Sequence, residues 1–424
     1  SYSQNPWFAA YNYINSSEKE RFIGAINARW DIKDYLYVRG RVGGDRYDHH
    51  RTNSTPWGTA YQPNGSMNET KRAFQQYDAD VFIGTDNLKL DDDVSFTAFV
   101  GVGQNSQEYS ATGVSGSHFI VPGLIDVKNT KNQGSSWSYW KKQINSAYGS
   151  AEIGFMDYAY LTITARNDWF STLSLKDKEA PNNDLYTSAS LSFVLSDALD
   201  LGSSVSFLKL RGGYSQVAGG ADSPYALSLA YGIYGQGHLG ASLGAISGGT
   251  IPNSEITPFE KNETEFGIDL RMFDNKLSID ATYYDNETLG DIVGVSASAT
   301  SGYGSALANL GNISNKGIEL LIKGTLIQSD DFAWNASFNY TNNTSKVVAT
   351  NDTGGNISMQ EPRSRNLRVT HIVGEKYGAL YGSSYVRDAS GAIVHQMVNG
   401  IPIPKIGPRK ILGFGVAPTQ LGIG

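Results

Sequence analysis

The chain contains no cysteine, so disulfide bonds, thiolate catalysis and cysteine-ligated metal sites are excluded. It also has no uninterrupted apolar run of about 18 residues, the length that a membrane-spanning helix needs. Hydrophobic residues make up only 40% of the 424 residues. The net charge is −7, and the 34 lysines and arginines form no long basic run, so a nucleic-acid partner is not expected.

Aromatic residues and glycine are abundant. The chain has 25 Tyr, 17 Phe, 7 Trp and 47 Gly, although its apolar share lies below the roughly 45–50% of ordinary globular domains. This combination is typical of a thin-walled β structure with one apolar face and long polar loops. A membrane protein without spanning helices must be a closed barrel, because only a barrel satisfies its backbone polar groups in lipid.

Alternating hydrophobicity predicts about twelve or thirteen strands of about ten residues. In the clearest pair, residues 263–270 and 277–283, apolar and polar residues alternate on both sides of a turn at 273–276. Asp274 and Asn275 suit the positive φ angles of such a turn. The other predicted strands are 22–30, 36–42, 79–83, 94–102, 147–155, 158–165, 189–195, 205–214, 318–323 and 332–340.

Links between these strands alternate between short and long. The long links, at 46–73, 105–144, 168–183, 218–259, 286–314 and 342–408, are rich in Gly, Ser, Asn and Thr. Short periplasmic turns alternating with long extracellular loops are typical of outer-membrane barrels. The sequence therefore predicts an all-β fold, a transmembrane antiparallel β-barrel, with residues 1–424 forming a segment of one barrel domain.

Charged residues on the predicted strands are expected to face the barrel lumen, because a basic side chain in lipid costs about 2–4 kcal/mol at the bilayer midplane. The candidates are Arg39, Arg41, Glu265, Glu319 and Lys323. They either line a substrate path or form a charge network that braces the wall. Aromatic residues in the predicted loops are candidates for contacts with a ligand or a partner protein: Trp57, Trp137, Trp140 and Tyr225.

No catalytic, cofactor-binding or metal-binding residues are predicted, and the protein is not expected to be an enzyme. Residues 235–240 fit a GxGxxG pattern, but no helical pattern follows them. His49 and His50 are interpreted as residues at the start of a solvated loop, and Asp91–Asp93 as a hairpin turn.

Several stretches resemble the SusC/RagA-like group of TonB-dependent outer-membrane transporters. The most specific is NLGNISNKGIEL at residues 309–320, which is similar to that family's NIGEVRNKGIEL signature. LRGGYSQ at 210–216 resembles its LRASYGQ strand, and residues 257–269 resemble its LKWETT…NIGLD passage. Further matches lie at residues 5–7, 20–24 and 31–36, and at 373–382 and 410–413. The resemblance covers residues 5–413, almost the whole chain.

The resemblance implies a barrel of about 22 strands with an N-terminal plug and a TonB box. It also implies a SusD-like surface lipoprotein as partner, outer-membrane lipid and lipopolysaccharide as surroundings, and a glycan or peptide as substrate. The chain departs from this pattern because it shows no plug and has too few residues for 22 strands. We therefore expect it to be the middle portion of the barrel, with the plug domain and terminal strands not present, and TonB contacted through the absent N-terminal region.

Two other functions stay open at this stage. A barrel of this family could be a structural subunit of a larger outer-membrane assembly or secretion complex, without transport of its own. A secreted β-sandwich or propeller that binds glycans is the third hypothesis. The alternation of turn and loop lengths argues against it, as does the absence of a repeat of about 40–50 residues.

Overall fold

The computed structural model describes residues 4–175, 181–234, 239, 241, 243–247, 249–297, 299–350, 355–360 and 367–424. Its main element is a 13-stranded sheet, in which the strands follow one another in chain order. These strands are β1 (Ile14–Lys33), β2 (Leu36–Thr55), β3 (Ser66–Lys89), β4 (Val94–Phe119), β5 (Thr130–Phe155), β6 (Ala159–Phe170), β7 (Asn183–Val194), β8 (Val205–Gly219), β12 (Phe259–Met272), β13 (Leu277–Leu289), β16 (Asn312–Gln328), β17 (Ala333–Ala349) and β24 (Thr419–Ile423).

Short elements lie before, between and after these strands. The helices are α1 (Pro6–Asn12), α2 (Leu195–Ala198), η1 (Val127–Asn129), η2 (Ser171–Leu173) and η4 (Ala299–Ser301). The small strands are β9 (Ala230–Tyr234), β10 (Leu243–Ser247), β11 (Thr250–Ile251), β14 (Ile292–Ser296), β15 (Ser305–Asn309), β18 (Ile357–Gln360), β19 (Leu367–His371), β20 (Ala379–Tyr385), β21 (His395–Val398), β22 (Ile401–Pro404) and β23 (Ile406–Phe414). Among the described residues, no helix has the length and apolarity to cross a membrane.

The chain forms two compact units. Unit 1 comprises residues 1–85, 99–148 and 168–172, and unit 2 comprises residues 86–98, 149–167 and 173–424. Unit 1 contains β1, β2 and most of β3, β4 and β5, whereas unit 2 contains the strands from β7 onward.

In unit 1, the pairing of neighbouring strands sorts the side chains onto two faces. Ile26 pairs with Val42 and Val42 with Ala79, so these three side chains share one face, which we call the apolar face. Ile26 is 78% exposed and Val42 is 58% exposed. A sheet that leaves such side chains uncovered needs an apolar environment on that side, as a lipid bilayer provides.

Unit 2 repeats this arrangement in the β12–β13 hairpin. Phe266 pairs with Tyr283, and Ile268 with Ala281, on its apolar face. The turn between the strands holds Asp274 at φ 54° and Asn275 at φ 65°, which confirms the predicted positive φ angles. Phe273 also has a positive φ, which its residue type did not predict.

The strands are longer than the sequence pattern indicated. β4 and β5 contain 26 residues each, so most of the predicted loop 105–144 is strand, and the predicted loop 46–73 is likewise mostly β2 and β3. A strand of 26 residues spans about 85 Å, whereas the apolar band of an outer-membrane barrel is about 25 Å tall. Outside that band both faces of a strand are polar, so the backbone ladder continues after the hydrophobic alternation has ended.

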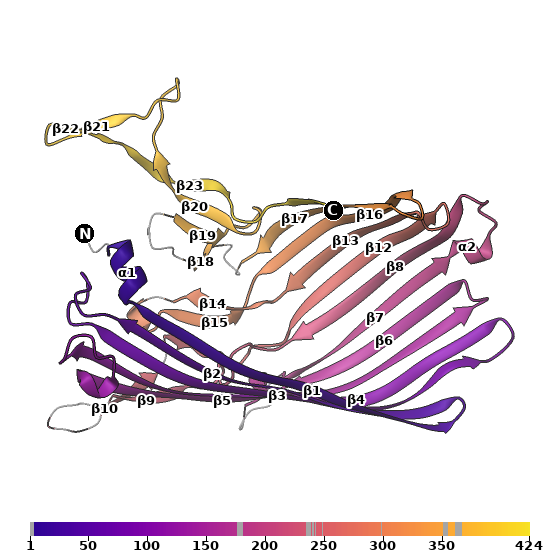
Figure 1. Ribbon diagram of the computed structural model, residues 1–424, viewed down its shortest axis with the longest axis horizontal. Helices are drawn as coiled ribbons and strands as arrows, with labels where there is room; N and C mark the ends of the chain where they lie inside the picture. The colour runs from indigo at the N-terminus through magenta and orange to yellow at the C-terminus, as the bar shows by residue number, and fades with distance from the viewer. Residues whose placement is uncertain are drawn as a thin grey trace. The chain divides into compact units, whose positions relative to one another are not determined.

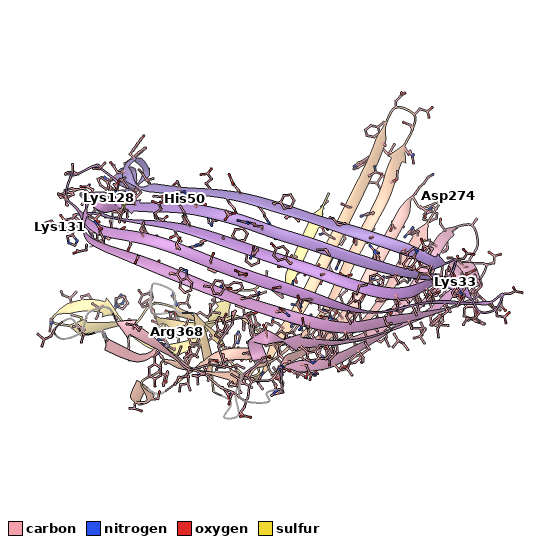
Figure 2. All side chains as sticks on the ribbon, turned by 90° about the horizontal axis from the view of Figure 1, so that it is seen from below. Lys33, His50, Lys128, Lys131, Asp274 and Arg368 are labelled. Carbon is pink, nitrogen blue, oxygen red and sulfur yellow. The ribbon has the colours of Figure 1, made fainter. Side chains whose placement is uncertain are left out.

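The two ends of these strands differ in their connections. In the view of Figure 2, Lys33 marks the end with the short β1–β2 turn, and Lys128 and Lys131 mark the opposite end of the strands of unit 1. In unit 2, a four-stranded sheet of β18, β19, β20 and β23 follows β17, and the hairpin β21–β22 extends from it (Figure 1). The predicted fold class, an antiparallel β-barrel with short turns and long connections on opposite rims, is confirmed by the strand pairing and by the comparisons below.

Candidate functional site

The face opposite the apolar face, here called the polar face, carries the charged side chains of the strands. Arg41 pairs with Asn27 on β1 and with Asp80 on β3, and all three lie on the polar face of unit 1. Arg39 lies on the same face, opposite Arg29 and Phe82. These arginines alternate with Val38 and Val42, as a period of two residues requires.

Ion pairs cross the polar face of unit 1 between neighbouring strands. Arg21 donates two hydrogen bonds to Asp45, at 2.8 and 2.5 Å, and an Arg41 nitrogen lies 2.7 Å from an Asp80 oxygen. Because these side chains are exposed to solvent, the pairs contribute little to stability. Their main effect is to hold the side chains in fixed positions across β1, β2 and β3.

Four aromatic rings from four strands form a row on the polar face, which we call the aromatic rib. Tyr47 stacks on Phe74 with 5.2 Å between ring centroids, and Tyr109 stacks on Trp140 at 5.5 Å. Phe74 meets Trp140 edge to face at 6.3 Å, which joins the two stacks. The rib crosses β2, β3, β4 and β5.

Two lysines flank the aromatic rib. Lys19 Nζ lies 3.9 Å from the Tyr47 ring centroid, and Lys142 Nζ lies 5.8 Å from that of Trp140. Cation–π contacts of this kind stabilise by about 0.5–1 kcal/mol at exposed sites. A second aromatic row on the same face contains Tyr37, Phe82, Phe99 and Tyr148.

In unit 2, Arg211 connects three strands on the polar face. Its side chain starts on β8 and crosses Gly267 of β12 to reach β13, where Nη2 lies 3.1 Å from Asp280 and 2.5 Å from the Thr282 hydroxyl. Its Nε lies 3.5 Å from Glu265. The absence of a side chain at position 267 makes this crossing possible, because a Cβ there would lie 2.5 Å from the guanidinium.

The charged residues that the sequence assigned to the lumen thus lie on the polar face of their own unit. Glu265 lies in the Arg211 cluster, whereas Glu319 pairs with Thr282 and Lys323 with Ser278 on the same polar face of unit 2. The sequence did not identify Arg211 or Asp280 as site residues. The alternation of Arg211 with Leu208 and Leu210 would have assigned Arg211 to the polar face. Its contacts with Asp280 and Glu265 could not be predicted, because they depend on the register of three strands.

Of the predicted loop aromatics, only Trp140 joins a cluster on the polar face. Trp137 and Trp140 were expected in a loop, but both lie on β5, and their odd separation places them on opposite faces. Trp137 stacks on Tyr139, with 6.0 Å between ring centroids. Trp57 lies in the link between β2 and β3, and Tyr225 lies after β8 with φ 64°; both are exposed.

The interpretation of His49 and His50 as the start of a loop was wrong, because both lie within β2. His49 lies 2.8 Å from the Ser17 hydroxyl, and His50 lies 2.8 Å from Glu69. No group of three potential metal ligands occurs among the described residues. Most of the GxGxxG stretch, 235–238 and 240, lies outside the described residues, and Asp91–Asp93 lie between β3 and β4 as predicted.

His371 is a buried titratable residue of β19, in the small sheet of unit 2. Burial lowers its pKa below the ordinary 6.5, and the charge of Asp291 opposes this effect. The ring contacts Tyr377, and its Nε2 has no hydrogen-bond partner among the described residues. The unfolded chain takes up the proton near pH 6.5 and the folded chain at lower pH, so the stability contribution is complete above 6.5 and is lost as pH falls through the lower folded pKa.

We therefore expect amide hydrogen exchange of β19 to accelerate as pH falls from about 7.5 to about 5, after correction for intrinsic exchange rates. His371→Phe should remove this acceleration, whereas His395→Phe, in the exposed β21–β22 hairpin, should leave it unchanged. Acceleration of the same size in His371→Phe would contradict the role of His371.

The comparisons with known proteins agree on one class. A family model described as "TonB dependent receptor-like, beta-barrel" matches residues 1–406. TonB-dependent receptors P3 and P26 of Formosa agariphila are each 25% identical to the chain, over 57% and 72% of its length. The chain covers only 24% and 31% of those receptors.

Solved structures show the same fold. The RagAB peptide transporter matches 99% of this chain with a TM-score of 0.79 at 19% identity, and the chain covers 47% of that protein. The siderophore receptor PiuA from Acinetobacter baumannii matches 97% with a TM-score of 0.52 at 13% identity, with 59% of the receptor covered. The predicted resemblance to SusC/RagA-like proteins and the predicted outer-membrane location are confirmed. The chain belongs to the TonB-dependent receptor-like β-barrel family of the outer membrane.

Proposed function

We propose that the chain is part of a TonB-dependent transporter that imports oligosaccharides or peptides together with a SusD-like surface lipoprotein. In this proposal the 424 residues form one section of the barrel wall, and the plug and the remaining strands come from other parts of the polypeptide. The proposal assigns the chain no catalytic role.

The polar face is the observation that carries this proposal. Charged and hydrogen-bonding side chains cover it, including the Arg21–Asp45 and Arg41–Asp80 pairs of unit 1 and the Arg211 cluster of unit 2. The opposite face carries exposed residues such as Ile26 and Phe266. In a membrane-spanning barrel the apolar face contacts lipid and the polar face lines a water-filled lumen, through which polar substrates can pass. Arg39, Arg41, Glu265, Glu319 and Lys323 then all face the lumen.

Uptake by cells that carry the intact protein tests this function. Deletion of its gene should abolish energy-dependent uptake of labelled oligopeptides or oligosaccharides, and a protonophore should have the same effect on the unmodified cells. If deletion leaves uptake of both classes unchanged but dissociates a larger outer-membrane complex, the chain is a structural subunit and the transport function is wrong.

A matched pair of variants tests whether the aromatic rib takes part. Trp140→Ala removes the ring that joins the two stacks of the rib, whereas Trp137→Ala removes a ring from the opposite face of the same strand. We expect Trp140→Ala to reduce uptake about tenfold, which corresponds to about 1.4 kcal/mol, and Trp137→Ala to leave uptake unchanged. Equal losses in the two variants would mean that the rib has no specific role.

A further inference from the structure

The polar face of unit 1 carries more positive than negative charge, although the whole chain has a net charge of −7. Within β1–β5 of this unit, four aspartates lie on this face, and each is held by a neighbour. Asp31 is paired with Arg29, Asp45 with Arg21 and Asp80 with Arg41. The fourth, Asp78, accepts hydrogen bonds from Asn105 and Gln76.

Five further basic side chains on this face form no ion pair with a carboxylate of the described residues: Lys19, Arg39, Arg51, Arg72 and Lys142. Lys19, Arg39 and Lys142 lie over aromatic rings, and Arg51 contacts the Asn53 side chain at 3.3 Å. We call these five residues the cationic wall. They come from four strands, β1, β2, β3 and β5. On β2, Arg39 and Arg51 lie on either side of Tyr47 of the aromatic rib along the strand.

Arg72 is the wall residue with an unsatisfied hydrogen-bond donor. Its Nε is buried and has no hydrogen-bond partner among the described residues. Arg72 pairs with His49, which pairs with Lys19, so three basic side-chain types lie in one row across β1, β2 and β3. Buried donors in folded proteins nearly always have an acceptor, and a guanidinium is best satisfied by a carboxylate.

Three acidic residues next to Lys19 and His49 in the sequence lie on the other face. Glu18, Glu20 and Asp48 alternate with Lys19 and His49 along β1 and β2, so they cannot neutralise the cationic wall. The excess of positive charge on the polar face therefore depends on which strand positions carry the charged residues.

The aromatic rib favours a peptide over a sugar as the anion. Sugar rings bind by stacking on a free aromatic face, but one face of each ring is covered, because Tyr47 stacks on Phe74 and Tyr109 stacks on Trp140. Lys19 and Lys142 lie over the rings at the two ends. The wall thus offers positive charges and tyrosine hydroxyls, which match closely spaced carboxylates.

We propose that the cationic wall selects acidic oligopeptides as cargo. This inference rests on the proposed transport function and names the substrate class. Carboxylate side chains of an extended peptide bind the unpaired basic groups of the wall, which project from strands spaced about 4.8 Å apart. Charge complementarity of this kind supplies specificity and speeds capture from dilute solution.

Binding to the intact protein in detergent, with its co-purifying partners, tests the proposal. We expect a fluorescent oligoglutamate peptide to bind about tenfold more tightly than an oligoglutamine peptide of the same length at ~0.05 M salt, with the difference lost at ~0.5 M salt. Equal binding of the two peptides at low salt would overturn the proposal. Tight binding of oligogalacturonate with no binding of oligoglutamate would overturn the peptide assignment.

Arg72 and Lys142 each have a matched control on the same strand. Arg72→Gln and Lys142→Gln should each weaken oligoglutamate binding about fivefold, whereas Lys71→Gln and Lys141→Gln, on the opposite face, should change it less than twofold. Heat-modifiable migration on gels shows that each variant is folded. Equal losses of oligoglutamate binding in the wall variants and the control variants would contradict a specific role of the cationic wall in binding.

The two proposals fail in different ways. Binding in detergent needs no energised membrane. A preference for oligoglutamate in detergent without any uptake by cells would therefore reject the transport function but support binding of acidic peptides by the cationic wall. Uptake that is indifferent to peptide charge would reject the wall and retain transport.

Discussion

Ile26→Arg is expected to destabilise the folded protein in a bilayer by about 2–4 kcal/mol. Ile26 lies in the middle of the apolar segment 22–30 of β1, is 78% exposed and pairs with Val42. On the apolar face an arginine there must enter the hydrocarbon, where its charge loses water and finds no acceptor. Urea-dependent unfolding in lipid vesicles, read from the folded band on unheated gels, measures this change.

The neighbouring residue provides the control. Ala25 lies on the polar face opposite Gly43, so Ala25→Arg has room for its side chain and places the charge toward water. We expect Ala25→Arg to change the unfolding free energy by less than about 0.5 kcal/mol. Equal destabilisation by both variants, or none by Ile26→Arg, would show that the two faces have been assigned the wrong way round or that β1 does not cross the bilayer at this position.

The membrane-spanning part of the fold was predictable from sequence, because lipid on one side and water on the other impose a period of two residues. The predicted strands 22–30 and 36–42 lie inside β1 and β2, and 263–270 and 277–283 lie inside β12 and β13. The true strand ends were not predictable. β2 runs on to Thr55 through residues such as His49 and His50, whose side chains are polar on both faces. Only hydrogen bonds to the neighbouring strands keep that segment extended.

The clusters of the polar face were not predictable, because they depend on register. Arg39 and Arg41 could be assigned to a face from their spacing alone. The aromatic rib requires that Tyr47 lie opposite Phe74 and that β4 and β5 bring Tyr109 and Trp140 beside them, which no local pattern specifies. A shift by one residue in any of these pairs would move a ring to the apolar face.

Gly267→Leu is expected to destabilise unit 2 by about 2 kcal/mol. Any Cβ at position 267 would occupy the space that the Arg211 guanidinium crosses, at 2.5 Å. Arg211 would then leave Asp280 and Glu265, and both carboxylates, which lie on the same face, would lose their cation. Water in the lumen screens part of this repulsion, since the Arg211 side chain is 30% exposed, so the loss stays below that of a fully buried ion pair.

A double-mutant cycle separates this mechanism from a general cost of a larger side chain. Gly324→Leu, where the nearest atoms lie 3.8 Å or more from the new Cβ, should change stability little. Arg211→Met should cost about 1–2 kcal/mol by itself. In the Arg211→Met background Gly267→Leu should then cost almost nothing, because the guanidinium that it displaces is already absent. Additive costs would mean that the leucine clashes with another group and that Gly267 is not kept free for Arg211.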